Sequence, residues 1–191
     1  MKKDTDVVCV ILAAGLGRRF GGSKMLHPIA NGDAMLAQTI SRYQSCFDLV
    51  SVIYPKNDKE LTVFLDTKNV EAIAIENNTK GLSQSLITGI KANIKAQGWL
   101  IALGDMPYVE SQTIMLIKNA IQYDNIVIPR FHARIGNPVG FGCTFKDQLI
   151  ALKGDVGAKS IIQSKPDKVE FIDTDDEGVL LDIDYPSSII R

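Results

Sequence analysis

A basic, glycine-rich segment over residues 12–24 carries the residue types best suited to chemistry in this sequence. It follows an apolar run at residues 7–11 that is typical of a buried strand. Small residues let a backbone approach a ligand closely, and their N–H groups can point at phosphate oxygens. The small residues here are Ala13, Ala14, Gly15 and Gly17. Arg19 and Lys24 add positive charge, so the segment favours a polyanion such as a nucleoside triphosphate (NTP). A glycine-rich connection without a ligand is the alternative.

Two better-known glycine loops do not fit this segment. Gly17 and Gly22 have the spacing of the Walker pattern G-x-x-x-x-G-K-[ST], but Ser23 and Lys24 stand in the reverse order. The dinucleotide pattern needs a third glycine where Phe20 stands, and an acidic residue at the end of the second strand. The second strand instead ends in I-Y-P-K. The segment is therefore a long basic loop of another kind.

A carboxylate follows the strongly apolar run over residues 99–103. The sequence G-D-M-P places Asp105 at the end of this buried strand, where ligands of open α/β sheets lie. The position suits Mg²⁺ beside phosphates, and the alternative is an aspartate that only stabilises a tight turn. Asp182 and Asp184 stand two residues apart, on one face of an extended segment. They could close a metal site with Asp105.

A polar loop over residues 76–85 leads into a helix and could border a ligand. Its candidate residues are Asn77 or Asn78, Gly81, and Ser83 or Ser85. Glycine permits close approach, and a serine at a helix N-terminus can donate to a ligand. The alternative is an N-capped helix start without a ligand.

Two later segments could contact a second ligand. Arg130, His132 and Arg134 alternate, which would place them on one side of an extended segment beside an anion. A solvated hairpin rim is the equal alternative. Asp155 stands between two glycines, a pattern that indicates a helix cap and a close contact.

The order of the predicted elements gives the fold class. Apolar runs predict strands over residues 7–12, 49–54, 70–75, 99–103, 126–129 and 169–172. Capped or amphipathic segments predict helices over residues 33–47, 57–66, 110–122 and 145–152, and two more that end near 96 and at 163. This alternation implies an α/β fold with a mainly parallel sheet and helices on both faces. No linker, repeat or low-complexity tract interrupts residues 1–191, so we expect a single domain.

Composition excludes several classes of protein. Hydrophobic residues at 46% and charged residues at 23% are ordinary for a soluble globular protein. A net charge of −1 without a basic block argues against a nucleic-acid partner, and no apolar run is long enough to span a membrane. Cys9, Cys46 and Cys143 share no ligand spacing and are typical of small buried hydrophobes in a reducing cytoplasm. The acidic turn over residues 173–178 is predicted to be solvated surface.

The basic loop resembles a family signature. Residues 12–24 fit the pattern L-A-A-G-x-G-x-R-x-G-x-x-K of the nucleotidyltransferases at every specified position. Three later motifs resemble the molybdenum cofactor branch of that family, especially its cytidylyltransferases. They are G-N-P-V-G-F at 136–141, L-K-G-D-V-G-A at 152–158 and D-I-D-Y-P at 182–186. The resemblance implies a three-layer Rossmann-like fold that transfers CMP or GMP to the phosphate of molybdopterin, with Mg²⁺ and release of pyrophosphate.

The resemblance also implies roles for individual residues. Arg19 and Lys24 would stabilise charge on the leaving pyrophosphate, and Asp105 with Asp184 would hold Mg²⁺. The implied nucleotide-binding residues are Leu12, Ala13, Ala14, Gly15, Gly17, Lys24, Asn77 or Asn78, Gly81 and Ser85. The implied acceptor-binding residues are Arg134, Asn137 and Asp155. The attacking phosphate is already ionised, so no side-chain nucleophile or general base is required.

Three positions depart from the pattern of the cytidylyl branch. Asn137 replaces the usual histidine, Lys159 an arginine and Tyr185 a threonine, and the first two fall where the acceptor is expected. Ala14 stands where the guanylyl branch has a second glycine, and its methyl would narrow the base pocket in favour of CTP. The alternatives are transfer to a sugar or polyol phosphate, and a non-catalytic carrier of nucleotide or cofactor. Expected partners are an NTP, a molybdopterin-like acceptor and a molybdoenzyme.

Overall fold

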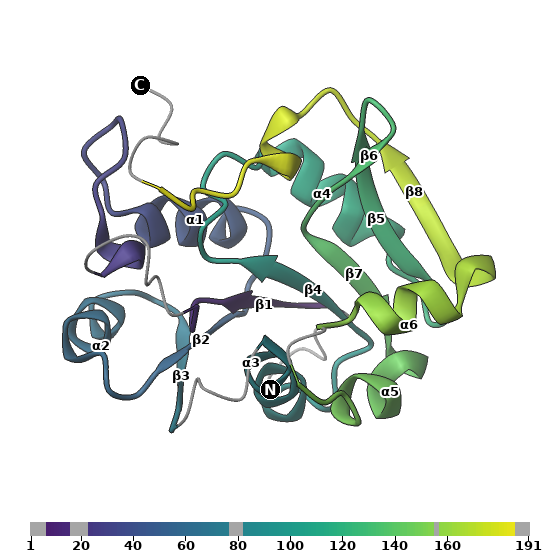
Figure 1. Cartoon of the computed structure of the whole chain (residues 1–191), viewed down its shortest axis with the longest axis horizontal. Coiled ribbons are helices and arrows are strands. Elements are labelled where there is room, and N and C mark those ends of the chain that lie inside the picture. The colour runs from purple at the N-terminus through teal and green to yellow at the C-terminus, as the bar shows by residue number, and fades with distance from the viewer. Residues whose placement is uncertain (1–6, 16–22, 77–81, 155–156, 186–191) are drawn as a thin grey trace.

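A computed structural model describes residues 7–15, 23–76, 82–154 and 157–185. Within them an eight-stranded sheet runs between helices that cover both of its faces (Figure 1). The strand order is β3-β2-β1-β4-β7-β5-β6, and β8 pairs with the free edge of β5. The strands are β1 (Val8–Leu12), β2 (Val50–Pro55), β3 (Glu71–Ile75), β4 (Gly98–Leu103), β5 (Ile126–Phe131), β6 (Arg134–Ile135), β7 (Val139–Gly142) and β8 (Val169–Asp173).

Most strand pairs are parallel, as the sequence predicts. Strands β3, β2, β1 and β4 run parallel to one another, and β5 runs parallel to β8. The exceptions are β7, which lies antiparallel between β4 and β5, and β6, which pairs antiparallel with β5; neither strand is predicted from the sequence. The carboxyl ends of β1 and β4 therefore meet at one edge of the sheet, with Leu12 beside Leu103.

The side chains of β1 alternate between two hydrophobic cores. Cys9 and Ile11 face the core under one helical layer, and Val8 and Val10 face the other. The first layer is α1 (Met35–Gln44), α2 (Lys59–Asp66) and α4 (Ser111–Ala120); the second is α3 (Leu82–Ala92), α5 (Lys146–Ile150) and α6 (Lys159–Ser164). Figure 1 shows α1 and α4 on one side of the sheet and α3, α5 and α6 on the other. The three-layer α/β architecture is thus confirmed.

The segment with Arg130, His132 and Arg134 is a tight hairpin. His132 and Ala133 both have positive φ and form the turn between β5 and β6, so Phe131 pairs with Arg134. The two arginines therefore lie on different strands. Arg130 donates two hydrogen bonds to Asp173 in β8, at 2.7 and 2.9 Å. The prediction that the three residues share one side of an extended segment is wrong, because the chain reverses at His132.

Residues 174–185, which we call the C-terminal strap, run from β8 back toward the end of β4 (Figure 1, yellow). The strap contains a short 3-10 helix, η5 (Glu177–Leu180). Val179 and Ile183 are 0% and 1% exposed, so the strap is part of the core. Asp176 is also buried, and its carboxylate accepts hydrogen bonds from the backbone N–H groups of Gly178 and Glu110, both at 2.8 Å. The prediction of a merely solvated acidic turn is therefore wrong at Asp176.

Candidate active site

Three charged side chains from distant parts of the sequence meet at the edge of the sheet. The ammonium of Lys24 donates to Asp105 Oδ2 at 2.7 Å and to Asp184 Oδ1 at 3.0 Å. Lys24 is only 8% exposed, whereas Asp105 and Asp184 are 20% and 49% exposed. We call these residues the Lys24 cluster. The structure thus brings together the cation and both carboxylates that the sequence assigns to phosphate and metal binding.

Each member of the cluster is placed by a different element. Lys24, the last residue of the basic loop, begins a 3-10 helix, η1 (Lys24–Leu26). Asp105 lies two residues beyond the end of β4, and Asp184 is delivered by the strap. A backbone hydrogen bond from Ile183 N to Asp105 O, at 3.0 Å, joins the last two segments. The site is therefore assembled by tertiary structure.

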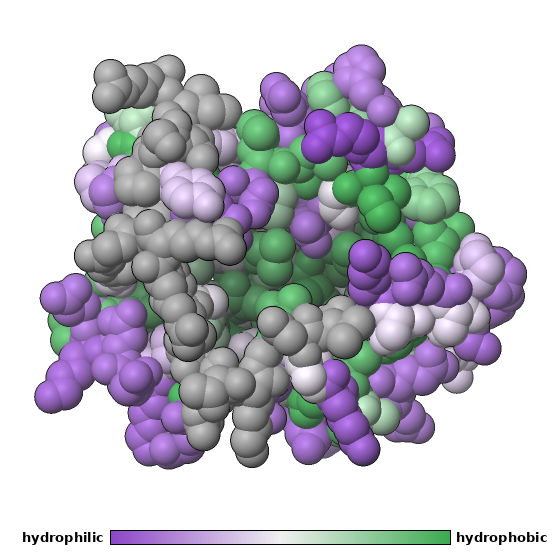
Figure 2. All heavy atoms as spheres, in the orientation of Figure 1, coloured by the Kyte–Doolittle hydropathy of each residue, from purple (hydrophilic) through white to green (hydrophobic). Residues whose placement is uncertain are grey.

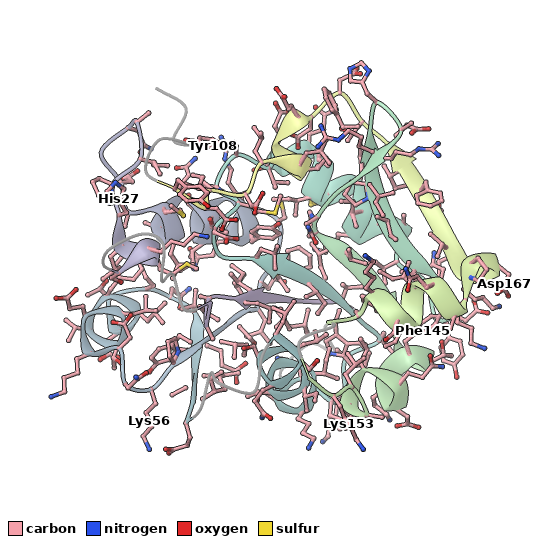
Figure 3. All side chains as sticks on the ribbon, in the orientation of Figure 1. His27, Lys56, Tyr108, Phe145, Lys153 and Asp167 are labelled. Atoms are coloured by element: carbon pink, nitrogen blue, oxygen red, sulfur yellow. The ribbon has the colours of Figure 1, made fainter. Side chains whose placement is uncertain are left out.

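The strap is fixed near the cluster by close packing as well as by hydrogen bonds. Ile183 packs with Ile29 and Met35, and Tyr108 lies against this group beside the strap (Figure 3). A Cβ atom at Gly178 would lie 2.3 Å from the carbonyl oxygen of Tyr108, so only glycine fits there. These contacts set the position of Asp184.

The turn that carries Asp105 is packed against the start of the basic loop. Gly104 N donates to Leu12 O at 2.9 Å, and Thr39 Oγ1 donates to Gly104 O at 3.1 Å. A Cβ atom at Gly104 would lie 3.1 Å from Met25 Sδ and 3.2 Å from Ala13 Cβ. Glycine at this position lets the turn before Asp105 approach residues 12–15.

The charges of the cluster favour the ammonium form of Lys24. Burial alone would lower the pKa of Lys24, but the hydrogen bonds and negative charges of Asp105 and Asp184 raise it above its ordinary value of 10.5. One ammonium beside two carboxylates leaves a formal net charge of −1. The cluster can therefore accept further positive charge.

The two carboxylates fit a divalent cation that is also held by a substrate. Among the described residues, no group of three or more His, Cys, Asp or Glu side chains is placed to hold a metal ion. Mg²⁺ commonly takes one or two carboxylates and completes its shell with phosphate oxygens and water. Asp105 and Asp184 could supply those carboxylates.

The predicted nucleotide-binding residues that the structure describes begin at the end of β1. Leu12, Ala13 and Ala14 are buried, whereas Gly15 is exposed, and a Cβ atom there would meet nothing within 4 Å. Ala14 packs in the core beneath α3 and is 7% exposed. Its methyl therefore contributes little surface to an open pocket. Ser85 is buried in α3 at 4% exposure.

Two hydroxyls near these segments are buried and unpartnered in the described structure. They are Ser23 Oγ, next to Lys24, and Ser83 Oγ, in the first turn of α3. Buried polar atoms are nearly always hydrogen-bonded, so each is suited to receive a ligand group. Figure 2 shows the molecular face hollowed near its centre, where Figure 1 draws β4 and β7, with hydrophobic residues on its floor.

The predicted acceptor residues differ in their placement. Asn137 is half-buried, and its N–H donates to Val179 O of the strap at 2.9 Å. Arg134 is exposed on β6, and no hydrogen bond or ion pair between described residues joins it to the Lys24 cluster. The predicted site residues Gly17, Arg19, Asn77, Asn78, Gly81 and Asp155 lie outside the described residues.

Sequence reasoning missed the residues that hold the site in place. Asp176 stands in an acidic run, and Thr39 is one of several residues on the buried face of a helix. No sequence signal distinguishes either residue. Ser23 could have been noticed, because it directly precedes the lysine of the signature.

Known proteins resemble this chain along most of its length. A family model described as "MobA-like NTP transferase domain" matches residues 9–169. Nicotine blue oxidoreductase of Paenarthrobacter nicotinovorans is 26% identical over 98% of both chains. The bifunctional protein GlmU of Buchnera aphidicola is 27% identical over 76% of this chain, which spans only 31% of that protein.

Solved structures share the fold. Rv0371c of Mycobacterium tuberculosis superposes with a TM-score of 0.85 and 24% identity, over 97% of this chain and 96% of that one. A nucleotidyl transferase of Methanothermobacter thermautotroptrophicus gives a TM-score of 0.83 and 23% identity, over 95% and 93%. Rv0371c has also been solved as a complex with manganese, with a TM-score of 0.80 and 22% identity, over 97% and 96%.

None of the helices in the described ranges has both the length and the apolar character needed to cross a membrane.

Proposed function

The chain belongs to the family of MobA-like NTP transferase domains, and on that premise we propose that it transfers CMP from CTP to a molybdopterin-type phosphate. The observation that carries the proposal is that the Lys24 ammonium contacts a carboxylate oxygen of both Asp105, at 2.7 Å, and Asp184, at 3.0 Å. A lysine and two carboxylates at the end of two parallel strands supply the charges that a triphosphate and its cation require.

The reaction is an in-line displacement. An oxygen of the acceptor phosphate forms a bond to the α-phosphorus as the bond to the bridging oxygen breaks, and that oxygen leaves with pyrophosphate. Lys24 and the N–H groups of the basic loop stabilise the charge on the leaving group, with Arg19 expected to assist. Asp105 and Asp184 would hold Mg²⁺, which neutralises phosphate charge when bound. The protein contributes positioning and electrostatics and needs no nucleophile of its own.

The preference for CTP rests on the resemblance to the cytidylyl branch. Because Ala14 is buried in the core, its methyl contributes little to a pocket surface and does not carry this preference. A single methyl in a pocket discriminates by only about 1–3 kcal/mol, so hydrogen bonds to the base edge, from the backbone of residues 12–14 or from the loop over residues 77–85, must contribute.

The acceptor would lie on the side of the site nearest the strap. Asn137 is tied to the strap by its N–H, and Asp184 lies farther along the same strap. An acceptor bound beside Asn137 would therefore contact the strap that carries Asp184. Arg134 could reach the acceptor's anionic group from the hairpin, and Asp155 is a further candidate.

Two enzymatic alternatives have specific support. The GlmU match favours a sugar phosphate acceptor, although the chain spans only 31% of that protein. The match to nicotine blue oxidoreductase, over 98% of both chains, favours oxidation or reduction of a small molecule, for which NADH can serve as a test reductant. A non-catalytic carrier would bind nucleotide without releasing pyrophosphate.

A pyrophosphate-release assay across CTP, GTP, ATP and UTP separates these possibilities. Each NTP is combined with Mg²⁺ and either molybdopterin or a sugar phosphate, and NADH oxidation is followed in parallel. We expect release with CTP and molybdopterin, with Lys24→Met roughly a hundredfold slower. Lys168→Met is the matched control, because it removes a lysine from an exposed pair with Asp124. Binding of NTP without release would refute the transferase proposal, and faster release with GTP or ATP would refute the preference for CTP.

A further inference from the structure

We propose that Lys24 keeps the metal site closed until a nucleotide arrives, so that the divalent cation enters only together with the NTP. This inference rests on the proposed function and adds an order of binding to it. It starts from the contacts of the Lys24 ammonium with both carboxylates of the cluster.

Lys24 occupies the place that a shared cation would need. Its ammonium lies 2.7 Å from Asp105 Oδ2 and 3.0 Å from Asp184 Oδ1, so it bridges the two carboxylates as a metal ion would. A divalent ion bound to the same oxygens would sit beside a buried positive charge. Like charges in such contact repel strongly away from bulk water. Free cation therefore competes with the ammonium for the same ligands.

The residues that the structure describes offer too few ligands to win this competition for the cation. In the described residues, no third acidic, histidine or cysteine side chain completes a metal-binding group with Asp105 and Asp184. Mg²⁺ prefers octahedral oxygen coordination and readily takes phosphate oxygens beside one or two carboxylates. The missing ligands are those that a triphosphate carries.

A bound nucleotide favours both the binding of the cation and the departure of Lys24 from the carboxylates. Its phosphates bring oxygens for the cation and, at the same time, an anionic partner for the lysine. Lysine has a long flexible stem and a compact charge, so the ammonium can move from the carboxylates to a phosphate without being deprotonated. The two carboxylates and a divalent cation are then formally neutral, and the ammonium faces the triphosphate. Each charged group therefore has an oppositely charged partner both before and after the exchange.

The test is Mn²⁺ binding without nucleotide, measured by electron paramagnetic resonance of the free ion. The single variant Asp105→Asn, which retains Lys24, should bind Mn²⁺ as wild type does, because Lys24 closes the site in both proteins. In Lys24→Met, whose side chain is of similar length, a Mn²⁺ site should appear with at least tenfold higher affinity than wild type. Adding Asp105→Asn to Lys24→Met should abolish the gain. Lys168→Met, the matched lysine control, should behave as wild type.

Addition of CTP completes the experiment. With CTP present, wild type should bind Mn²⁺ in an Asp105-dependent manner. The proposal is overturned if wild type without nucleotide binds Mn²⁺ as tightly as Lys24→Met, or if the gain in Lys24→Met survives Asp105→Asn. It is also overturned if folded Lys24→Met and Lys24→Gln, checked by circular dichroism, both gain no site. Failure to bind any NTP in calorimetry would instead refute the proposed function and leave the nucleotide-free result standing.

Discussion

Removal of the Asp176 carboxylate should release the strap that delivers Asp184. Each oxygen of Asp176 accepts one backbone N–H at 2.8 Å, from Gly178 and from Glu110, and the residue is 6% exposed. A buried N–H group that loses its hydrogen-bond acceptor lowers the free energy of unfolding by about 1–3 kcal/mol. Asp176→Ala should therefore lower the free energy of unfolding by about 3 kcal/mol, allowing for some water entry. That corresponds to a fall in Tm of about 6–12 °C for a chain of this size.

Two variants sharpen this prediction. Asp176→Asn keeps one acceptor oxygen and should lose about half as much stability as Asp176→Ala. Asp175→Ala removes the same charge from an exposed neighbour and should change Tm by little. Differential scanning calorimetry measures all three, and hydrogen exchange at the Ile183 amide reports whether its bond to Asp105 is lost. Equal Tm values for Asp176→Ala and Asp175→Ala would refute the assignment of Asp176 as the anchor of the strap.

Four further outcomes are expected. Asp184→Asn should slow pyrophosphate release roughly a hundredfold and raise the Mg²⁺ concentration that the reaction needs. Asp182→Asn, on the same exposed stretch, should change neither. Equal rates of release for the two variants would exclude Asp184 from the site. Gly178→Ala, whose Cβ would lie 2.3 Å from a carbonyl oxygen, should cost about 1–3 kcal/mol of stability. Gly15→Ala should leave Tm unchanged and weaken NTP binding about tenfold or more in calorimetry. Because the Lys24 pKa is raised, its stabilisation is fully present below the ordinary value of 10.5 and lost as pH rises through the higher folded value. The Tm difference between wild type and Lys24→Met should stay constant from about pH 6 to 9 and shrink above about 10.5.

Local pattern was enough to predict most of the sheet and part of the site. The apolar runs before the basic loop and before Asp105 form β1 and β4, which lie side by side, so Lys24 and Asp105 meet. Strand β7 was missed because its four residues, V-G-F-G, contain two glycines and lack a clear strand pattern. The hairpin at His132 could not be distinguished from an extended segment by sequence, because alternating charged residues fit both a single strand and a two-residue turn.

The remaining errors concern residues whose roles depend on long-range contacts. Asp176 is an ordinary acidic residue in sequence and becomes a buried anchor only when the strap reaches the backbone of Glu110. The bridge from Lys24 to both carboxylates was likewise beyond sequence reasoning, which assigned the carboxylates to metal and the lysine to phosphate.

The contact between Lys24 and Asp184 joins residues 160 positions apart, and this has a consequence for synthesis on the ribosome. The chain is made from its N-terminus, so Lys24 and then Asp105 emerge long before the strap exists. Closing so long a loop also costs entropy that only the completed packing of Val179 and Ile183 repays. A ribosome-bound chain arrested before residue 176 can therefore form β1 to β4 but lacks Asp184. Such a nascent chain should pair Lys24 with Asp105 first and gain its second carboxylate as one of the last events of folding.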